Sequence, residues 1–175
     1  MIADFGLRIA ECGFSKTDYW LLTTDYYEKM STIIDIAEAV AAELNAAEPG
    51  TFSQDFTARR KVIPAYKLEE LNGLKVSVVP RGVEITSSTR AGSQYDFALD
   101  IGIQKRIGRD VDTDVQALIV LVDEIADFLQ RRPLAAAPFV KWLRCFNDPI
   151  YVPEHLTEQR TFTSVLTLTY RAVTA

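Results

Sequence analysis

The sequence predicts a domain that combines strands with helices, and two patterns carry this prediction. From Gln94 to Arg106 apolar and polar residues alternate, as in a strand with one buried and one solvated face. From Thr113 to Arg132 the apolar residues recur at helical spacing, which predicts an amphipathic helix. The chain has 175 residues, of which 48% are hydrophobic and 25% charged, so it can bury a substantial core as one domain.

The strand predicted over 94–106 is long, roughly twice the usual ~5 to 6 residues. We therefore expect part of it to project past its sheet or to pair with something outside the chain. Its apolar side, which holds Phe97, Leu99 and Ile101, is expected to pack against the helix that follows it. In that helix, Thr113 and Gln116 are placed like a capping box.

The remaining elements follow from similar patterns. A first helix is expected over residues 33–44, with Thr32 and Asp35 placed like a capping pair. Pro80-Arg81-Gly82 is expected to turn the chain between two short strands, so that residues 74–88 form a hairpin. Two more strands are expected over 139–146 and 161–170, joined by a Pro-bracketed extended stretch with a short turn.

The basic residues Arg59, Arg60 and Lys61 lie in a short strand predicted over 56–63. Pro64 prevents this strand from continuing as a central one, so an edge position fits. The three charges are interpreted as an inter-subunit edge that forms ion pairs, or as a solvated edge that blocks aggregation. Contact with nucleic acid is the less favoured alternative.

Composition and motifs exclude several classes of protein. A net charge of −5 argues against a protein that mainly grips nucleic acid, because that requires clustered Lys and Arg. Cys12 and Cys145 have no CxxC or His companions, so neither a disulfide framework nor a zinc site is indicated. The sequence has no GxSxG, P-loop, GxGxxG or HExxH motif and no apolar stretch of membrane-spanning length. We expect no enzyme activity, cofactor, metal or membrane partner.

The residues that invite a chemical interpretation are Asp96, Asp100 and His155. The two carboxylates share one face of the predicted strand, where they would serve acid–base or metal chemistry only if other strands brought partners close. A solvated face is one alternative; a ring lumen or assembly face, where the carboxylates would repel passing DNA phosphates, is another. A lone histidine near a turn, even beside Glu154, is more often a packing residue than a catalyst.

Residues 1–29 differ from the rest, because Tyr19, Trp20, Tyr26 and Tyr27 crowd together without a clean period. Met30 then resembles a protein start. We expect either an arm that packs on a neighbouring subunit or an N-terminal extension. The single domain is expected to span residues 30–175.

In their order, the elements resemble those of the tail terminator, or tail-completion, proteins of tailed bacteriophages, of the kind represented by the terminator of phage lambda. The resemblance covers about residues 30–175. Its carrying segments are the helix STIIDIAEAVAAELN, the stretch VSVVPRGVEITSS, the strand QYDFALDIGIQKR, the helix DTDVQALIVLVDEIADFLQRR and the closing NDPIYVPEHLTEQRTFTSVLTLTYR.

This resemblance implies an α+β fold, with a largely antiparallel sheet and two main helices packed on it, that assembles as a homohexameric ring. In that family the ring ends polymerisation of the tail tube and joins the tail to the head-proximal neck, leaving a channel for DNA. The implied partners are further copies, the tail tube protein and a head–tail connector or stopper protein, with DNA passing without specific binding.

The implied location is the virion tail or neck, after assembly in the host cytoplasm. The family supplies no catalytic residues. Two alternatives remain open: a head-closure or adaptor protein of the same neck, and, less favoured, a small enzyme or ligand-binding module that uses Asp96, Asp100 and His155.

Overall fold

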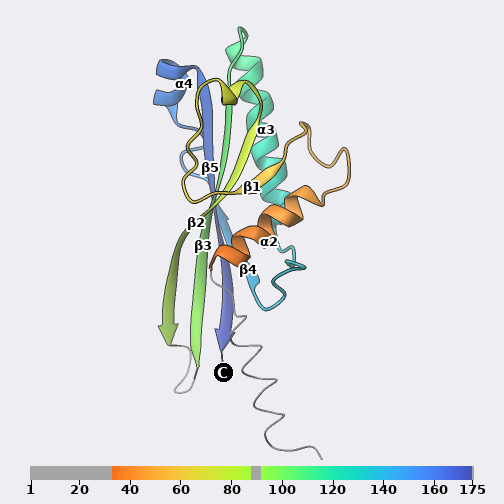
Figure 1. Ribbon diagram of the computed structural model, residues 1–175, viewed down its shortest axis with the longest axis vertical. Coiled ribbons are helices and arrows are strands. Elements are labelled where there is room, and N and C mark those ends of the chain that lie inside the picture. The colour runs from red at the N-terminus through yellow and green to blue at the C-terminus, as the bar shows by residue number, and fades with distance from the viewer. Residues whose placement is uncertain (1–32, 88–91, 175) are drawn as a thin grey trace, which may run out of the picture. The chain divides into compact units, whose positions relative to one another are not determined.

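The computed structural model describes residues 33–87 and 92–174, and this part of the chain has an α+β fold (Figure 1). In chain order its elements are α2 (Ile33–Asn45), β1 (Ala58–Arg60), the 3₁₀ turn η1 (Glu70–Asn72), β2 (Lys75–Ser87), β3 (Ser93–Arg106), α3 (Val111–Leu129), β4 (Lys141–Phe146), α4 (Pro153–Gln159) and β5 (Thr161–Thr174). The predicted arm 1–29, Thr32 of the predicted capping pair and Cys12 lie outside the described residues.

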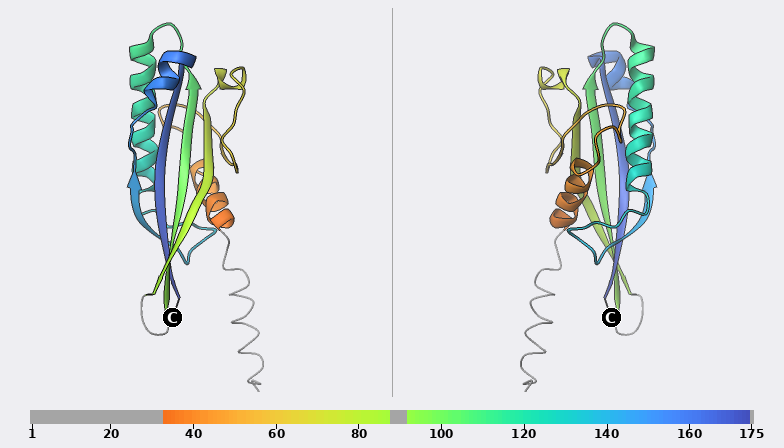
Figure 2. Two further views of the ribbon diagram at one scale, coloured as in Figure 1. Left: turned by 90° about the vertical axis from the view of Figure 1, so that its left-hand side faces the viewer. Right: turned by 90° about the vertical axis from the view of Figure 1, so that its right-hand side faces the viewer.

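The five strands form one sheet in the order β1-β2-β3-β5-β4. Only β1 pairs in parallel, with β2, and the other three pairings are antiparallel. Figures 1 and 2 show α2 and α3 on the same face of this sheet, while the short α4 lies beside one end of β5. The predicted largely antiparallel sheet with two main helices is confirmed.

The long central strand β3 is paired along its whole length within the chain. On one side it pairs with β5 from Ser93 opposite Thr174 to Arg106 opposite Thr161. On the other side it pairs with β2, which is 13 residues long. The expectation that β3 projects past its sheet or needs a partner outside the chain is therefore wrong, because β5 is as long as β3 and pairs with it from end to end.

The hairpin predicted within residues 74–88 is also wrong, because β2 runs through this stretch as one strand. Pro80 pairs with Leu99 and Gly82 with Ala98, so Arg81 is an extra residue in the ladder. This is a β-bulge, a place where proline is tolerated because the local hydrogen-bond pattern is already broken. Pro80 and Gly82, which in the sequence indicate a turn, flank a bulge in the structure.

Helix α3 begins two residues earlier than predicted. Its N-cap is Asp110, whose carboxylate accepts hydrogen bonds from the backbone N–H of Thr113 at 3.3 Å and from its hydroxyl at 2.8 Å. These bonds lower the pKa of Asp110. The predicted capping box of Thr113 and Gln116 is therefore wrong, because an aspartate three residues before Thr113 accepts the free N–H first.

The core lies between the sheet and the two helices. Leu99, Ile101 and Ile103 on the predicted inner face of β3 are fully buried, and they meet buried residues of α2 and α3 such as Val40 and Leu121. None of the helices within residues 33–87 and 92–174 is long and apolar enough to cross a membrane. The opposite sheet face is covered near Gly102 by the segment around Pro64, and it is open around Phe146 and Val165.

Candidate assembly surface

The sheet face opposite α2 and α3 carries an ion pair that joins β3 to β5. Arg171 lies opposite Asp96 in the β3–β5 ladder. Its Nε and Nη2 donate to Oδ1 and Oδ2 of Asp96, each at 2.7 Å, which is the bidentate geometry of strong guanidinium–carboxylate pairs. The hydrogen bonds from Arg171 hold the pKa of Asp96 below its ordinary value, so this carboxylate is ionised at neutral pH.

Asp100 has a separate set of partners on the same face. Its Oδ1 accepts from the hydroxyl of Thr167 at 2.7 Å and lies 3.3 Å from Nη1 of Arg81. The same Nη1 donates to the Thr167 hydroxyl at 2.9 Å. Since Arg81 is the extra residue of the β2 bulge, the bulge puts a guanidinium beside Asp100.

Beside these pairs the sheet face is hollowed over a volume of about 540 Å³, lined by residues from β2, β3, β4 and β5. We call this the open-face hollow. Arg144 lines it, and its Nε donates to the hydroxyl of Thr169 at 3.4 Å. Phe146 and Val165 also line it, with 58% and 37% of their surfaces exposed. The hollow thus combines guanidinium groups with exposed apolar side chains.

This geometry suits a contact surface better than a chemical site. Each carboxylate accepts hydrogen bonds from an arginine, so neither Asp96 nor Asp100 is placed as a free base. Across the described ranges no group of three or more His, Cys, Asp or Glu residues could hold a metal ion. The paired arginines also offset the negative charge on which DNA repulsion in a lumen would depend. The assignment of Asp96 and Asp100 to a lumen or assembly face stays a prediction.

Known proteins were compared with this chain on the basis of sequence and structure. No family model matches it, and no curated protein matches it. One solved structure that it resembles is the sheath/tube terminator, in the extended state, of an extracellular contractile injection system named PVC. That match has a TM-score of 0.44 and 15% sequence identity, and it covers 83% of this chain. The chain spans 57% of the length of that protein.

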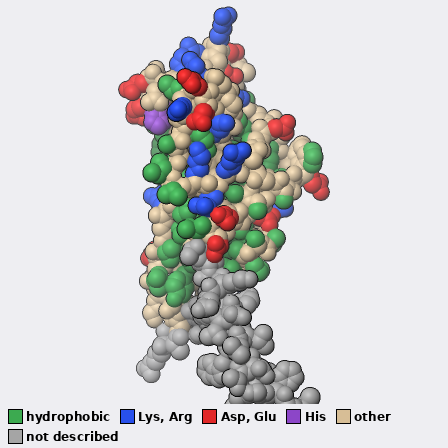
Figure 3. Space-filling model, in the orientation of Figure 1, with side chains coloured by type: hydrophobic (Ala, Val, Ile, Leu, Met, Phe, Trp, Pro, Cys, Tyr) green, Lys and Arg blue, Asp and Glu red, His purple; other side chains and the backbone are tan. Residues whose placement is uncertain are grey.

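The basic cluster lies at the edge of the sheet, as its proline context indicates. Arg59 and Arg60 belong to β1, the outermost strand, and Lys61 follows them. Arg60 forms an ion pair with Glu38 of α2 at 2.8 Å, and Nζ of Lys61 lies 3.5 Å from the centre of the Tyr66 ring. Figure 3 shows Lys and Arg side chains gathered where β1 lies. The role of this edge between subunits stays a prediction.

His155 and Cys145 both have structural surroundings. Nδ1 of His155 lies 3.1 Å from the hydroxyl of Thr163, which fits a packing role in attaching α4 to β5. Burial raises the pKa of the Cys145 thiol, so it is protonated and unreactive at neutral pH. Neither residue lies in a constellation typical of nucleophilic catalysis.

Sequence reasoning missed the arginines of this surface. Arg171 stands at the end of the alternation predicted over 161–170, on the same strand face as Thr167 and Thr169, so the strand pattern marks it as outward-facing. Its position opposite Asp96 depends on strand register, which the pattern alone does not give. Arg81 was assigned to a turn, and only the bulge turns it toward Asp100.

Proposed function

We propose that this protein is a structural subunit that caps a phage-type tail tube, ends its polymerisation and joins the tail to the head-proximal neck as a ring with a DNA channel. The observation that carries the proposal is the open sheet face, where ordered ion pairs lie beside exposed apolar side chains. Interfaces between proteins combine apolar anchors with a polar rim in this way.

The chemistry of the face supports an assembly role over an enzymatic one. The Asp96–Arg171 and Asp100–Arg81 pairs fix their side chains before a partner arrives, which lowers the entropy lost on binding. Phe146, more than half exposed, is the aromatic anchor that such a surface would bury against a partner. We propose that the partner is the tail tube protein, with further copies of this chain completing the ring.

The test combines ring formation with tube capping. Electron microscopy and native mass spectrometry of the purified protein are expected to show a closed ring, and addition of the protein to polymerising tail tube subunits should shorten the tubes. Phe146→Ser should weaken capping while the protein stays folded, because this side chain is largely in solvent. Leu68→Ser serves as the matched control, since Leu68 is similarly exposed, 52%, beside η1.

A protein that stays monomeric at all concentrations and leaves tube length unchanged would refute the proposal. If Phe146→Ser and Leu68→Ser reduced capping equally, the open sheet face would not be the surface that caps the tube. If the protein bound the connector side of the neck and did not bind the tube, the head-closure function would be favoured over tail capping.

A further inference from the structure

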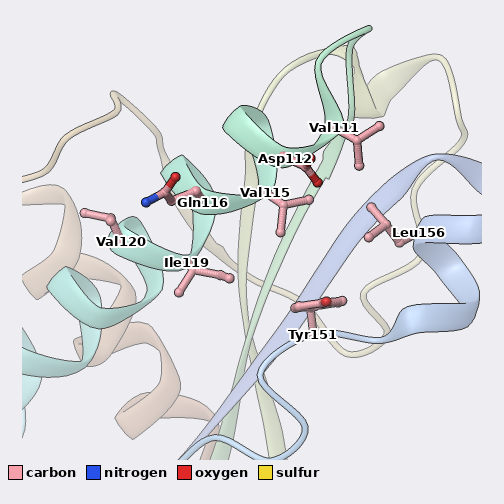
Figure 4. Close-up of a pocket in the computed structure, with 8 residues that line it drawn as sticks. All are labelled: Val111, Asp112, Val115, Gln116, Ile119, Val120, Tyr151 and Leu156. Carbon is pink, nitrogen blue, oxygen red and sulfur yellow. The ribbon is translucent and has the colours of Figure 1, made fainter.

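A second surface lies away from the open sheet face, between α3 and the segment that leads into α4. It is a groove of about 440 Å³ whose walls include Val115 and Ile119 on one side and Tyr151 and Leu156 on the other. Figure 4 shows these side chains facing one another across the gap. We call it the α3–α4 groove.

The helical wall of the groove repeats at every fourth residue. Val111, Val115 and Ile119 all line it, so their side chains form a stripe along α3 with a step of about 6 Å. All three are only partly buried and pack against the core from its margin. A stripe of this kind matches the apolar face of another helix laid beside it.

The opposite wall is held in place by the fold. The Tyr151 ring packs against buried Phe162 with ring centres 5.9 Å apart. Val152 donates its backbone N–H to the carbonyl of Thr163 at 2.9 Å, and His155 contacts the Thr163 hydroxyl. Arg160, which ends α4 in a left-handed conformation, accepts from the N–H of Ile107 at 2.8 Å. The groove is therefore formed before any ligand binds.

The charged residues of helix α3 itself all have one sign. Helix α3 holds five acidic residues and no Lys or Arg, and Asp112 lines the groove itself. Asp123 lies one turn beyond Ile119 and Val120, and Asp127 lies one turn further. Within the described part of the chain, none of these three carboxylates forms an ion pair. An apolar floor with an acidic margin favours a ligand of the opposite charge.

We propose that the α3–α4 groove docks a short amphipathic helix of a partner protein, which places apolar side chains against Val115, Ile119 and Leu156 and Lys or Arg side chains beside Asp112 and Asp123. This goes beyond the proposed capping function, which rests on the other face of the sheet. Failure of either proposal leaves the other unaffected.

The probe is a set of synthetic amphipathic helices with leucines one turn apart and lysines on the flanks, beside a second set in which glutamates replace the lysines. Fluorescence anisotropy should show that the full chain binds the basic set more tightly. Methyl NMR should place the largest shift changes on Val115, Ile119 and Leu156. The double substitution Asp112→Lys and Asp123→Lys should weaken binding of the basic peptides by roughly tenfold. It should also strengthen binding of the acidic peptides.

The matched control is Glu48→Lys combined with Glu69→Lys, which makes the same charge change at two exposed residues elsewhere. Equal binding of the two peptide sets, methyl changes outside the groove, or the same loss in the control would overturn the proposal. If Val120→Lys alters self-association while no peptide binds, the occupant is a second copy of this chain and the proposal is wrong. Val120 is 47% exposed, so this variant should fold.

Discussion

At the scale of single residues, the contact between Asp96 and Arg171 joins the two longest strands on the open face of the sheet. The Asp96 side chain is only 17% exposed, so its ion pair is less screened by water than an ordinary surface pair. Arg144 lies near enough to lower the pKa of Asp96 further, in the same direction as Arg171. The pair therefore contributes to stability as well as to the shape of the proposed interface.

We expect Asp96→Asn to destabilise the protein by roughly 1 to 2 kcal/mol at pH 7, between the values for an exposed ion pair and for a hydrogen bond to a charged group. Chemical denaturation followed by circular dichroism measures this difference. Asp123→Asn is the matched control, because exposed Asp123 forms no ion pair within the described residues. An equal effect of both substitutions would contradict the role given to Arg171.

The stabilisation should also depend on pH in one direction. Because the pKa of Asp96 is lower in the folded protein than in the unfolded chain, its contribution is complete above the unfolded value of about 3.9. It is lost as the pH falls through the lower, folded value. The difference between wild type and Asp96→Asn should therefore narrow below about pH 4, and a constant difference down to pH 2 would contradict this account.

At the scale of elements, α3 is attached to the sheet by one face. Leu118, Leu121, Val122, Ile125 and Leu129 are buried. Leu121 is fully buried, whereas the adjacent Val120 is 47% exposed. Leu121 therefore faces the sheet, whereas Val120 faces away from it.

Leu121→Ala is expected to destabilise the fold by about 2 to 5 kcal/mol, because it removes apolar contacts and leaves a cavity in a packed core. Val120→Ala should change stability by no more than about 0.5 kcal/mol. Thermal and denaturant unfolding of the two variants provide the measurement. Similar losses for both would mean that α3 does not pack on the sheet through the Leu121 face.

The sequence predicted most elements because their patterns are long. The fourteen residues of β3 repeat the strand period of two often enough to exclude a helix. The nineteen residues of α3 repeat the helical period often enough to exclude a strand. The bulge in β2 was missed because Pro80 and Gly82 are equally suited to a turn, and only pairing with the distant β3 decides between them. Helix α4, at seven residues, is too short to show a period and was expected only as a turn.

The candidate surface was predictable only in part, for the same reason. The alternation over 94–106 correctly put Asp96 and Asp100 on one outward face of a strand. Their partners Arg171 and Arg81 lie far away in sequence, and the ladder register that brings them together is set by tertiary pairing. Local patterns therefore found the acidic half of the surface and missed the basic half.

At the scale of the whole molecule, residues 1–29 are proposed to act as an arm that contacts a neighbouring subunit. Deletion of these residues should weaken the oligomer and leave the domain of residues 30–175 folded. Sedimentation velocity over a range of protein concentrations tests the first point, and circular dichroism tests the second. Assembly that is unchanged by the deletion would support the alternative of a plain N-terminal extension.

The pairing of β3 with β5 also affects how the chain folds during synthesis. Strand β5 is the last described strand, and α3, β4 and α4 all lie between it and β3 in sequence. Contacts between segments so distant form slowly, because a long loop must close before they are made. One edge of β3 stays unpaired until β5 has been synthesised and has left the ribosome. Newly made chains are therefore exposed to aggregation at this edge until β5 pairs with it.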